Sequence, residues 1–192
     1  MTAYETYETK IHCLLLAGLT LLAGCIPSLN AVYTEETLDF DPALVGTWQQ
    51  PGAKARWEFS KLDDKSYRLI YTDEEGQQGR FIGRLAKLDG ESFLDLFPED
   101  IEMDAVGFYK FHLVPIHTIY RLQRPEGKLK LSAIDFQWLD KYLNDHPGEI
   151  QYATFSGRKL ITAPTASVQT FVLAHKDQFT GNFELQKLEA NN

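Results

Sequence analysis

Two polar side chains on one predicted strand have the chemistry to hold a charged ligand. The segment 117–124, HTIYRLQR, alternates as a strand does, so His117 and Arg121 share one face. Tyr120 and Leu122 lie on the opposite face. If the first face lines the interior of a sheet, His117 and Arg121 would bind a carboxylate or phosphate group at the end of an apolar molecule. If it faces outward, the two residues form a solvated surface stripe.

An acidic side chain in a second apolar strand could act together with these residues. Asp95 lies within SFLDLF (92–97), where its neighbours on both sides are apolar. A carboxylate in such a place needs a partner, and Arg121 or one of the histidines could supply it. Buried pairs of this kind are structural more often than catalytic. The enzymatic alternative is a hydrolase that uses Asp95 and His117, which requires the two side chains to converge in a cleft.

The sequence contains none of the common motifs of catalytic or cofactor-binding sites. It has no G-x-S-x-G nucleophile elbow, no Walker A loop and no H-E-x-x-H metal motif. His112 and His117 are five residues apart, which places them on opposite faces of an unbroken strand. His146 is expected to stabilise a helix end, and His175 to be a hydrogen-bonded residue of the core. The residues therefore favour a protein without catalytic residues, metal or cofactor.

The N-terminal region carries the pattern of an exported protein. Residues 11–22 form an apolar segment that is too short to cross a bilayer as a helix but is typical of a signal peptide. It ends in Leu22-Ala23-Gly24-Cys25, which resembles the lipobox of bacterial lipoproteins. The structural alternative is an N-terminal core helix that ends in a turn of small residues.

The lipobox resemblance implies how the chain is processed and where it resides. A signal peptide of residues 1–24 would be removed, and Cys25 would carry a diacylglyceryl group that holds the protein at the membrane. Because Ile26 rather than an aspartate follows the cysteine, the resemblance also implies the outer membrane if the organism is Gram-negative. We expect residues 25–40 to form a tether and residues 41–192 to form one monomeric β-rich domain in the cell envelope.

The length and net charge of the chain indicate one domain and limit the kinds of molecule that it can bind. The chain has 192 residues, of which 44% are hydrophobic, and this suits one globular domain. It has 19 basic and 27 acidic residues, a net charge of -8. A nucleic-acid-binding surface requires a basic patch that replaces counterions, so binding to nucleic acid is not expected. The acidic domain is also repelled by anionic lipids, which leaves the acyl chains as the expected membrane contact.

Short strands with period-two alternation dominate the domain. They are predicted at 44–50, 55–61, 66–72, 80–88, 92–97, 117–124, 128–134, 150–162 and 183–190. Asp89-Gly90 and Pro125-Glu126-Gly127 are predicted hairpin turns. Helices are predicted at 137–145 and 165–176, the second with Thr165 as its N-cap.

A sheet of this size hides its edges most completely by closing on itself. We therefore expect a mostly-β fold, an antiparallel barrel or strongly curved sheet of eight to ten strands, with two short helices late in the chain. The sequence predicts no second domain, because it contains no internal repeat and no low-complexity run.

A short motif at the first strand is shared with one barrel family. Gly46-Thr47-Trp48 resembles the Gly-x-Trp motif of lipocalin-like (calycin) barrels. In that family the tryptophan closes one end of a barrel that holds a small apolar ligand, so the resemblance implies a lipocalin-like barrel. The arginine that the family places near its last strand is absent, and Lys187 is among the residues that stand there. The chain also resembles small bacterial envelope proteins, which implies no activity. Alternatively, Trp48 is simply a core aromatic that plugs one end of the sheet.

These observations suggest a ligand pocket inside the sheet. Its candidate residues are Trp48, Trp57, Tyr67, Asp95, His117 and Arg121. We expect a non-enzymatic binding module for a small hydrophobic or amphipathic molecule. The alternative is a structural or scaffolding lipoprotein that binds an envelope protein, for which an exposed apolar face on the strand 92–97 would be the sign.

Overall fold

The computed structural model describes residues 26–99, 107–110, 112–155 and 157–189 of the chain. The predicted signal peptide and Cys25 therefore lie outside the described residues. Within the described ranges, no helix is both long and apolar enough to cross a membrane.

The strands of the described ranges belong to one sheet of 12 strands. Their bounds are β1 Ile26–Ser28, β2 Leu38–Asp39, β3 Gly46–Gln49, β4 Arg56–Lys61, β5 Tyr67–Thr72, β6 Gln78–Leu88, β7 Glu91–Pro98, β8 His117–Gln123, β9 Leu129–Ile134, β10 Tyr152–Phe155, β11 Arg158–Ile161 and β12 Phe179–Lys187. The helices are α2 Gly107–Lys110, α3 Phe136–Asp145 and α4 Thr165–Ala174, and short 3-10 turns lie at η2 Pro42–Leu44, η3 Pro125–Gly127 and η4 Lys176–Gln178.

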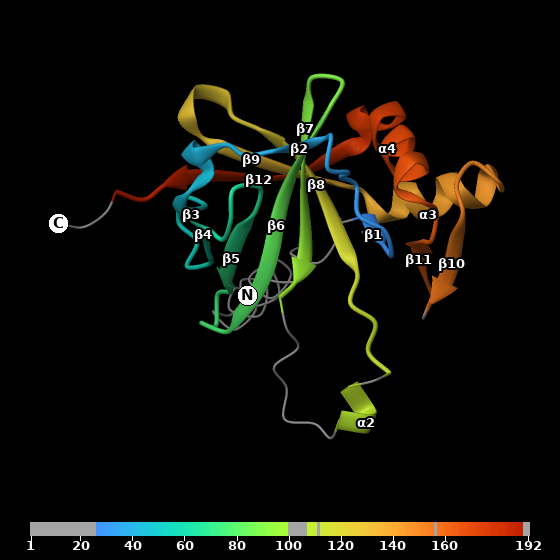
Figure 1. Cartoon of the computed structure of the whole chain (residues 1–192), viewed down its shortest axis with the longest axis horizontal. Helices are drawn as coiled ribbons and strands as arrows, with labels where there is room; N and C mark the ends of the chain where they lie inside the picture. The colour runs from blue at the N-terminus through green and yellow to red at the C-terminus, as the bar shows by residue number, and fades with distance from the viewer. Residues whose placement is uncertain (1–25, 100–106, 111, 156, 190–192) are drawn as a thin grey trace, which may run out of the picture.

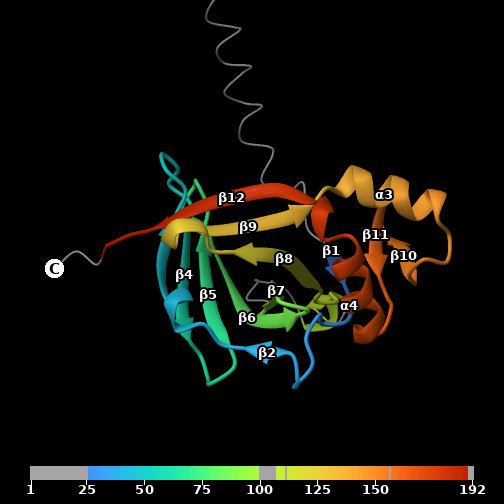
Figure 2. The same cartoon turned by 90° about the horizontal axis from the view of Figure 1, so that it is seen from above.

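Eight of these strands close into a barrel. Neighbouring strands follow the order β8-β7-β6-β5-β4-β3-β12-β9, and β9 pairs with β8 to close the ring. Every pairing in this ring is antiparallel. Figure 2 shows these strands curving round a common interior. The predicted mostly-β class, with a closed antiparallel barrel and two helices late in the chain, is confirmed.

The other strands and the two longer helices cover one side of the barrel. β1 continues the sheet from β8, and β11 and β10 follow it. α3 and α4 gather on the same side, at the right of Figures 1 and 2. β2 pairs separately with β6.

Alternation along the strands separates two hydrophobic cores. The core inside the barrel includes Leu94 of β7 and Tyr120 of β8. The core outside it includes Phe93 of β7 and Ile119 of β8, together with buried residues of α3 and α4. The strand 92–97 is therefore covered on both faces, and the exposed apolar face expected for a scaffold protein is not found there. Its outer face packs against the N-terminal segment and against residues of α3 and α4.

Residues 26–40 are part of the folded body, which corrects the expectation that they form a tether. β1 pairs with both β8 and β11, and Ile26 and Val32 are completely buried. Farther along, the Lys87 N–H donates to the Thr37 C=O at 2.8 Å. The segment crosses the barrel largely as irregular chain, and its buried residues therefore follow no period that sequence reasoning could detect.

The predicted strands correspond to β3–β12 and the predicted helices to α3 and α4, with the largest shift at β12, which begins at Phe179 instead of residue 183. The short elements β1, β2 and α2 were not predicted. The segment 150–162 forms two strands, β10 and β11. Asp89 and Gly90 both have positive φ angles (45° and 80°), as the predicted hairpin turn requires. The predicted N-cap of α4 is wrong by one position, because Thr165 is the first helical residue and Pro164 precedes it in the cap position.

Candidate functional site

Four inward-facing aromatic side chains gather toward one end of the barrel. Trp57 of β4 contacts Tyr71 of β5, Tyr120 of β8 and Phe183 of β12, with ring centroids 5.0, 6.2 and 5.8 Å away. Tyr120 and Phe183 also contact each other, at 6.4 Å. The β3–β4 and β5–β6 turns lie at this end, just beyond Trp57 and Tyr71. We call these four residues the aromatic end.

Exposure of the inward side chains increases toward the aromatic end. Trp57 and Tyr120 are 7% and 8% exposed, and Tyr71 and Phe183 are partly buried. Six inward side chains elsewhere in the barrel have no exposed surface: Trp48, Tyr67, Leu69, Leu94, Leu129 and Leu131. A side chain without accessible surface borders neither solvent nor a void that could hold a water molecule. The barrel is therefore packed around those residues, and its inner aromatic surface meets solvent at the aromatic end.

The opposite end of the barrel is closed by the segment before β3. The Trp48 indole N–H donates to the Leu44 C=O at 2.8 Å. Phe40 stacks on Tyr67 with ring centroids 4.7 Å apart, and the Tyr67 hydroxyl accepts a hydrogen bond from the Asp41 N–H at 2.6 Å. Burial raises the pKa of the Tyr67 phenol. Trp48 and Tyr67 thus pack against the residues that close this end of the barrel.

Two cations cover the ring of Trp48. Lys187 Nζ lies 5.4 Å and Arg124 Cζ 5.5 Å from its centroid, within the range of cation–π attraction. No arginine is present in β12, and the tryptophan is instead covered by Lys187 from that strand and by Arg124 from the end of β8. Gly46 has a φ of +135°, and a Cβ atom there would lie 2.5 Å from Lys187 Cε. The backbone angle therefore favours glycine two residues before Trp48, and any larger residue would also have to displace the flexible end of Lys187.

The six predicted pocket residues lie on two sides of the barrel wall. Three point inward: Trp48, Trp57 and Tyr67. Three belong to the outer faces of β7 and β8: Asp95, His117 and Arg121, which alternate with inward residues of those strands. The face that carries Tyr120 and Leu122 is the inner one, so the condition for placing His117 and Arg121 in the interior is not met. The sequence did carry a signal for the inner face, because the face with Tyr120 and Leu122 is the more apolar of the two.

Asp95 and His117 form a buried pair on the outer side of the barrel. His117 Nδ1 lies 2.6 Å from Asp95 Oδ1, and Asp95 Oδ2 accepts the Val32 N–H at 2.8 Å. The Asp95 side chain is 1% exposed. The imidazole also packs against Phe97, with ring centroids 4.6 Å apart, and meets the edge of Tyr33 at 6.4 Å. The predicted pairing of Asp95 with a histidine or Arg121 is thus made with His117.

This pair has the features of a structural contact. Through it, β7 holds both β8 and the N-terminal segment, and Gln169 of α4 donates to the Val32 C=O at 2.9 Å. Ser28 lies opposite His117 in the β1–β8 pairing, but it is completely buried and its hydroxyl donates to the Asn30 C=O at 2.7 Å. Ser28, the residue opposite His117, is therefore already hydrogen-bonded within its own turn. The arrangement favours a contact that holds residues 26–40 in place over the active site of a hydrolase.

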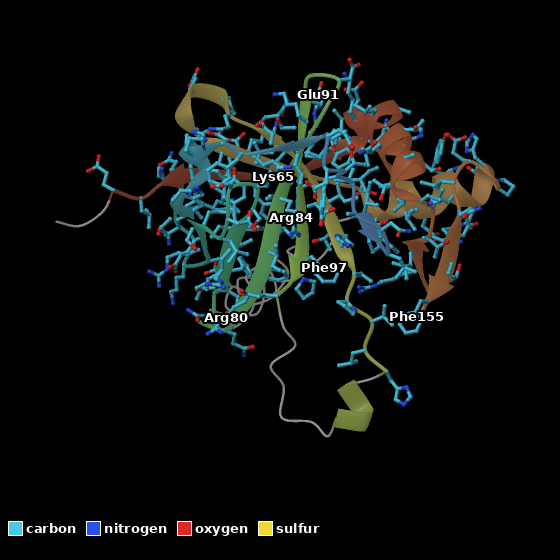
Figure 3. The ribbon with its side chains drawn as sticks, in the orientation of Figure 1. Lys65, Arg80, Arg84, Glu91, Phe97 and Phe155 are labelled. Carbon is cyan, nitrogen blue, oxygen red and sulfur yellow. The ribbon has the colours of Figure 1, made fainter. Side chains whose placement is uncertain are left out.

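Arg121 belongs to a network of ion pairs. Its Nε and Nη2 atoms donate to Glu91 Oε2 at 3.1 and 2.8 Å, and Lys176 Nζ donates to Glu91 Oε1 at 3.0 Å. Lys176 and Arg121 hold the pKa of Glu91 below its usual range. The network connects β8 and the turn after α4 with the β6–β7 hairpin, where Figure 3 labels Glu91. Arg121 is therefore neutralised within the protein rather than directed at a ligand.

Two histidines lie where α3 and α4 meet. His146 ends α3, and its Nδ1 donates to the Tyr142 C=O at 2.9 Å, in agreement with its predicted role. The His175 ring lies 5.3 Å from Trp138 and 4.6 Å from Tyr142, and its buried Nε2 makes no hydrogen bond. The carboxylate of Glu149 lies 3.8 Å from that atom. The expectation of a hydrogen-bonded core histidine is thus wrong for His175, whose pKa is lowered by burial.

Three members of the aromatic end, Tyr71, Tyr120 and Phe183, were not among the predicted pocket residues. Tyr71 alternates with Leu69 in β5. Tyr120 alternates with Leu122 in β8, and Phe183 alternates with Leu185 in β12, which is the pattern of an inward face in all three cases. In the described ranges, no group of three or more His, Cys, Asp and Glu side chains is placed to hold a metal ion. Cys25, the predicted site of lipid attachment, lies outside these ranges.

Comparison of the chain with family models, curated proteins and solved structures finds no match. The assignment of function therefore rests on the residues and their geometry.

Proposed function

We propose that the protein is a lipid-anchored lipoprotein of the cell envelope, in the outer membrane where the cell has one. Its barrel binds a small hydrophobic or amphipathic molecule at the aromatic end and catalyses no reaction. The resemblance of Leu22-Ala23-Gly24-Cys25 to a lipobox supports the anchor. The contact of Trp57 with three further aromatic rings supports the binding function.

The observation that carries the binding proposal is the contrast between the two ends of the barrel. At the closed end, Trp48 and Tyr67 have no exposed surface. At the aromatic end, Tyr71 and Phe183 remain partly exposed although they face the interior. Large aromatic side chains that remain partly exposed at the end of a barrel interior are typical of binding sites for apolar molecules.

Native mass spectrometry of the full chain isolated from its membranes tests the binding proposal. We expect a small molecule bound to the wild-type protein and to Phe155→Ala, an exposed residue outside the barrel. We expect the same molecule to be lost from the double variant Tyr71→Ala/Phe183→Ala. A protein that carries no small molecule and binds no added apolar probe would contradict the proposal.

The anchor is tested separately, by substitution of Cys25. Cys25→Ala removes the only thiol at the predicted attachment site, so labelled fatty acid should no longer be incorporated and the unprocessed precursor should accumulate. Labelling measured after growth with a radioactive or clickable fatty acid checks this. Undiminished labelling of Cys25→Ala would contradict the assignment.

A second candidate function, binding of a protein partner, is favoured by one surface feature. Phe155 is 73% exposed, in the strand β10, which pairs only with β11 among the described residues. Figure 3 shows this residue at the tip of the β10–β11 hairpin, away from the barrel. An open strand edge with an exposed aromatic side chain can accept an extended segment of another protein. Crosslinking from a photoreactive residue in place of Phe155 to one stoichiometric envelope protein would favour this candidate.

A further inference from the structure

Three carboxylates follow Tyr71 in the turn at the aromatic end. Asp73, Glu74 and Glu75 lie between β5 and β6, and the side chains of Glu74 and Glu75 are exposed. Burial is the main cause that raises the pKa of the Tyr71 phenol, and the charges of these three carboxylates raise it further. Their electric field therefore acts on a side chain of the aromatic end.

One of these carboxylates is fixed in position between two turns. Glu74 accepts hydrogen bonds from the N–H groups of Lys54 and Ala55, at 3.0 and 3.4 Å. Both donors belong to the β3–β4 connection, two or three residues before Trp57. Glu74 thus joins the turn that leads to Trp57 with the turn that follows Tyr71, and it places a negative charge beside the aromatic rings.

The balance of charge in these two turns is negative. The connection 50–55 contributes one cation, Lys54, whereas the connection 73–77 contributes the three carboxylates. Aromatic faces attract cations through their quadrupole, and neighbouring carboxylates add Coulomb attraction of the same sign. An anionic head group at this place would be repelled by both.

We infer that the ligand of the aromatic end is a small amphiphile with an apolar body and a cationic amine or quaternary ammonium group. The apolar body contacts Trp57, Tyr120 and Phe183, and the cation lies between the Tyr71 ring and the carboxylates of the β5–β6 turn. This inference rests on the proposed binding function and adds the charge of the ligand to it.

Three probes with the same apolar body test the inference: hexyltrimethylammonium, 1-hexanol and hexanesulfonate. They are titrated against the full chain in zwitterionic nanodiscs, with empty nanodiscs as a blank, and tryptophan fluorescence is recorded. A change that the Trp57→Phe variant abolishes is assigned to the aromatic end. We expect the ammonium probe to bind about tenfold more tightly than the alcohol, and the sulfonate to bind most weakly. The preference should shrink in 1 M NaCl, which screens exposed charges.

Substitution of the acidic turn separates charge from apolar contact. The variant Glu74→Gln/Glu75→Gln keeps an acceptor for the Lys54 and Ala55 N–H groups, and we expect it to lose most of the preference for the ammonium probe. Asp64→Asn, in the turn 62–66 at the other end of the barrel, should keep it. Equal binding of all three probes, or tighter binding of the sulfonate, would overturn the inference and leave the proposed function intact. Failure of every probe to change Trp57 would overturn both.

Discussion

At the scale of single residues, Asp95 decides how the N-terminal segment is held. It accepts hydrogen bonds from the His117 ring and from the Val32 N–H, and both groups lie in a largely buried place. Removal of a carboxylate from such a site leaves its partners unsatisfied. We predict that Asp95→Ala lowers the free energy of unfolding by about 3 kcal/mol, measured by urea denaturation.

A matched variant of an exposed aspartate provides the control for this prediction. Asp64 pairs with Lys61, but its side chain is 94% exposed. Exposed pairs contribute little to stability, so Asp64→Ala should leave the urea midpoint unchanged. If Asp95→Ala and Asp64→Ala lower the free energy of unfolding by the same small amount, the Asp95–His117 pair does not hold the N-terminal segment in place.

The pairing of Asp95 was predictable only in part. Its position between apolar neighbours indicates that it must be buried with a partner, and the sequence offers His117 and Arg121 as candidates. The sequence could not indicate that Arg121 is already neutralised by Glu91. It also could not indicate Val32, because the partner there is a backbone N–H of an irregular segment and carries no residue-type signal.

At the scale of elements, the packing of α3 against α4 carries a dependence on pH. Burial lowers the pKa of His175, and the nearby Glu149 opposes this shift while His146 adds to it. The unfolded chain therefore binds a proton at His175 more readily than the folded protein. The contribution of neutral His175 to the free energy of unfolding is therefore fully present above the ordinary histidine pKa of about 6.5. It is lost as the pH falls below that value.

The variant His175→Phe tests this dependence. A phenyl ring keeps the contacts with Trp138 and Tyr142 but takes up no proton. We predict that the melting temperature of the wild-type protein falls more steeply than that of His175→Phe between pH 7.5 and pH 5. Parallel melting curves for the two proteins over this range would show that His175 does not titrate with folding.

Strands and helices whose apolar residues recur at a regular spacing were predictable, and those without such a spacing were not. Alternation identified the strands of the barrel, and Asp89-Gly90 identified the β6–β7 turn. The segment 26–40 was expected to be a tether, because β1 and β2 are too short to show a period. These short strands exist through pairing with β8, β11 and β6, which are distant in sequence.

At the scale of the whole molecule, the sequence indicated a closed sheet but not its inner face. The strand 117–124 offers two faces, and Tyr120 with Leu122 makes the more apolar one, which lies inside. The N-terminal segment and the helices α3 and α4 cover the other face. The polar residues His117 and Arg121 are therefore also largely buried, where they pair with Asp95 and Glu91. Two cores in one domain explain why a pocket predicted from six residues is divided by the barrel wall.

The three tryptophans provide the most direct test of ligand binding at the aromatic end, because their rings have different surroundings. Trp48 and Trp57 are paired across β3 and β4, but the Trp48 ring lies under Arg124 and Lys187, whereas the Trp57 ring contacts Tyr71, Tyr120 and Phe183. Trp48 lies at the closed end, Trp57 at the aromatic end and Trp138 in α3. The full chain labelled with 5-fluorotryptophan can be titrated with 1-hexanol, a neutral probe, and followed by fluorine NMR. We predict a saturable shift that is largest for the Trp57 resonance, smaller for its cross-strand neighbour Trp48 and absent for Trp138. A Trp57 resonance that does not move, or a shift confined to Trp48 or Trp138, would contradict binding at the aromatic end.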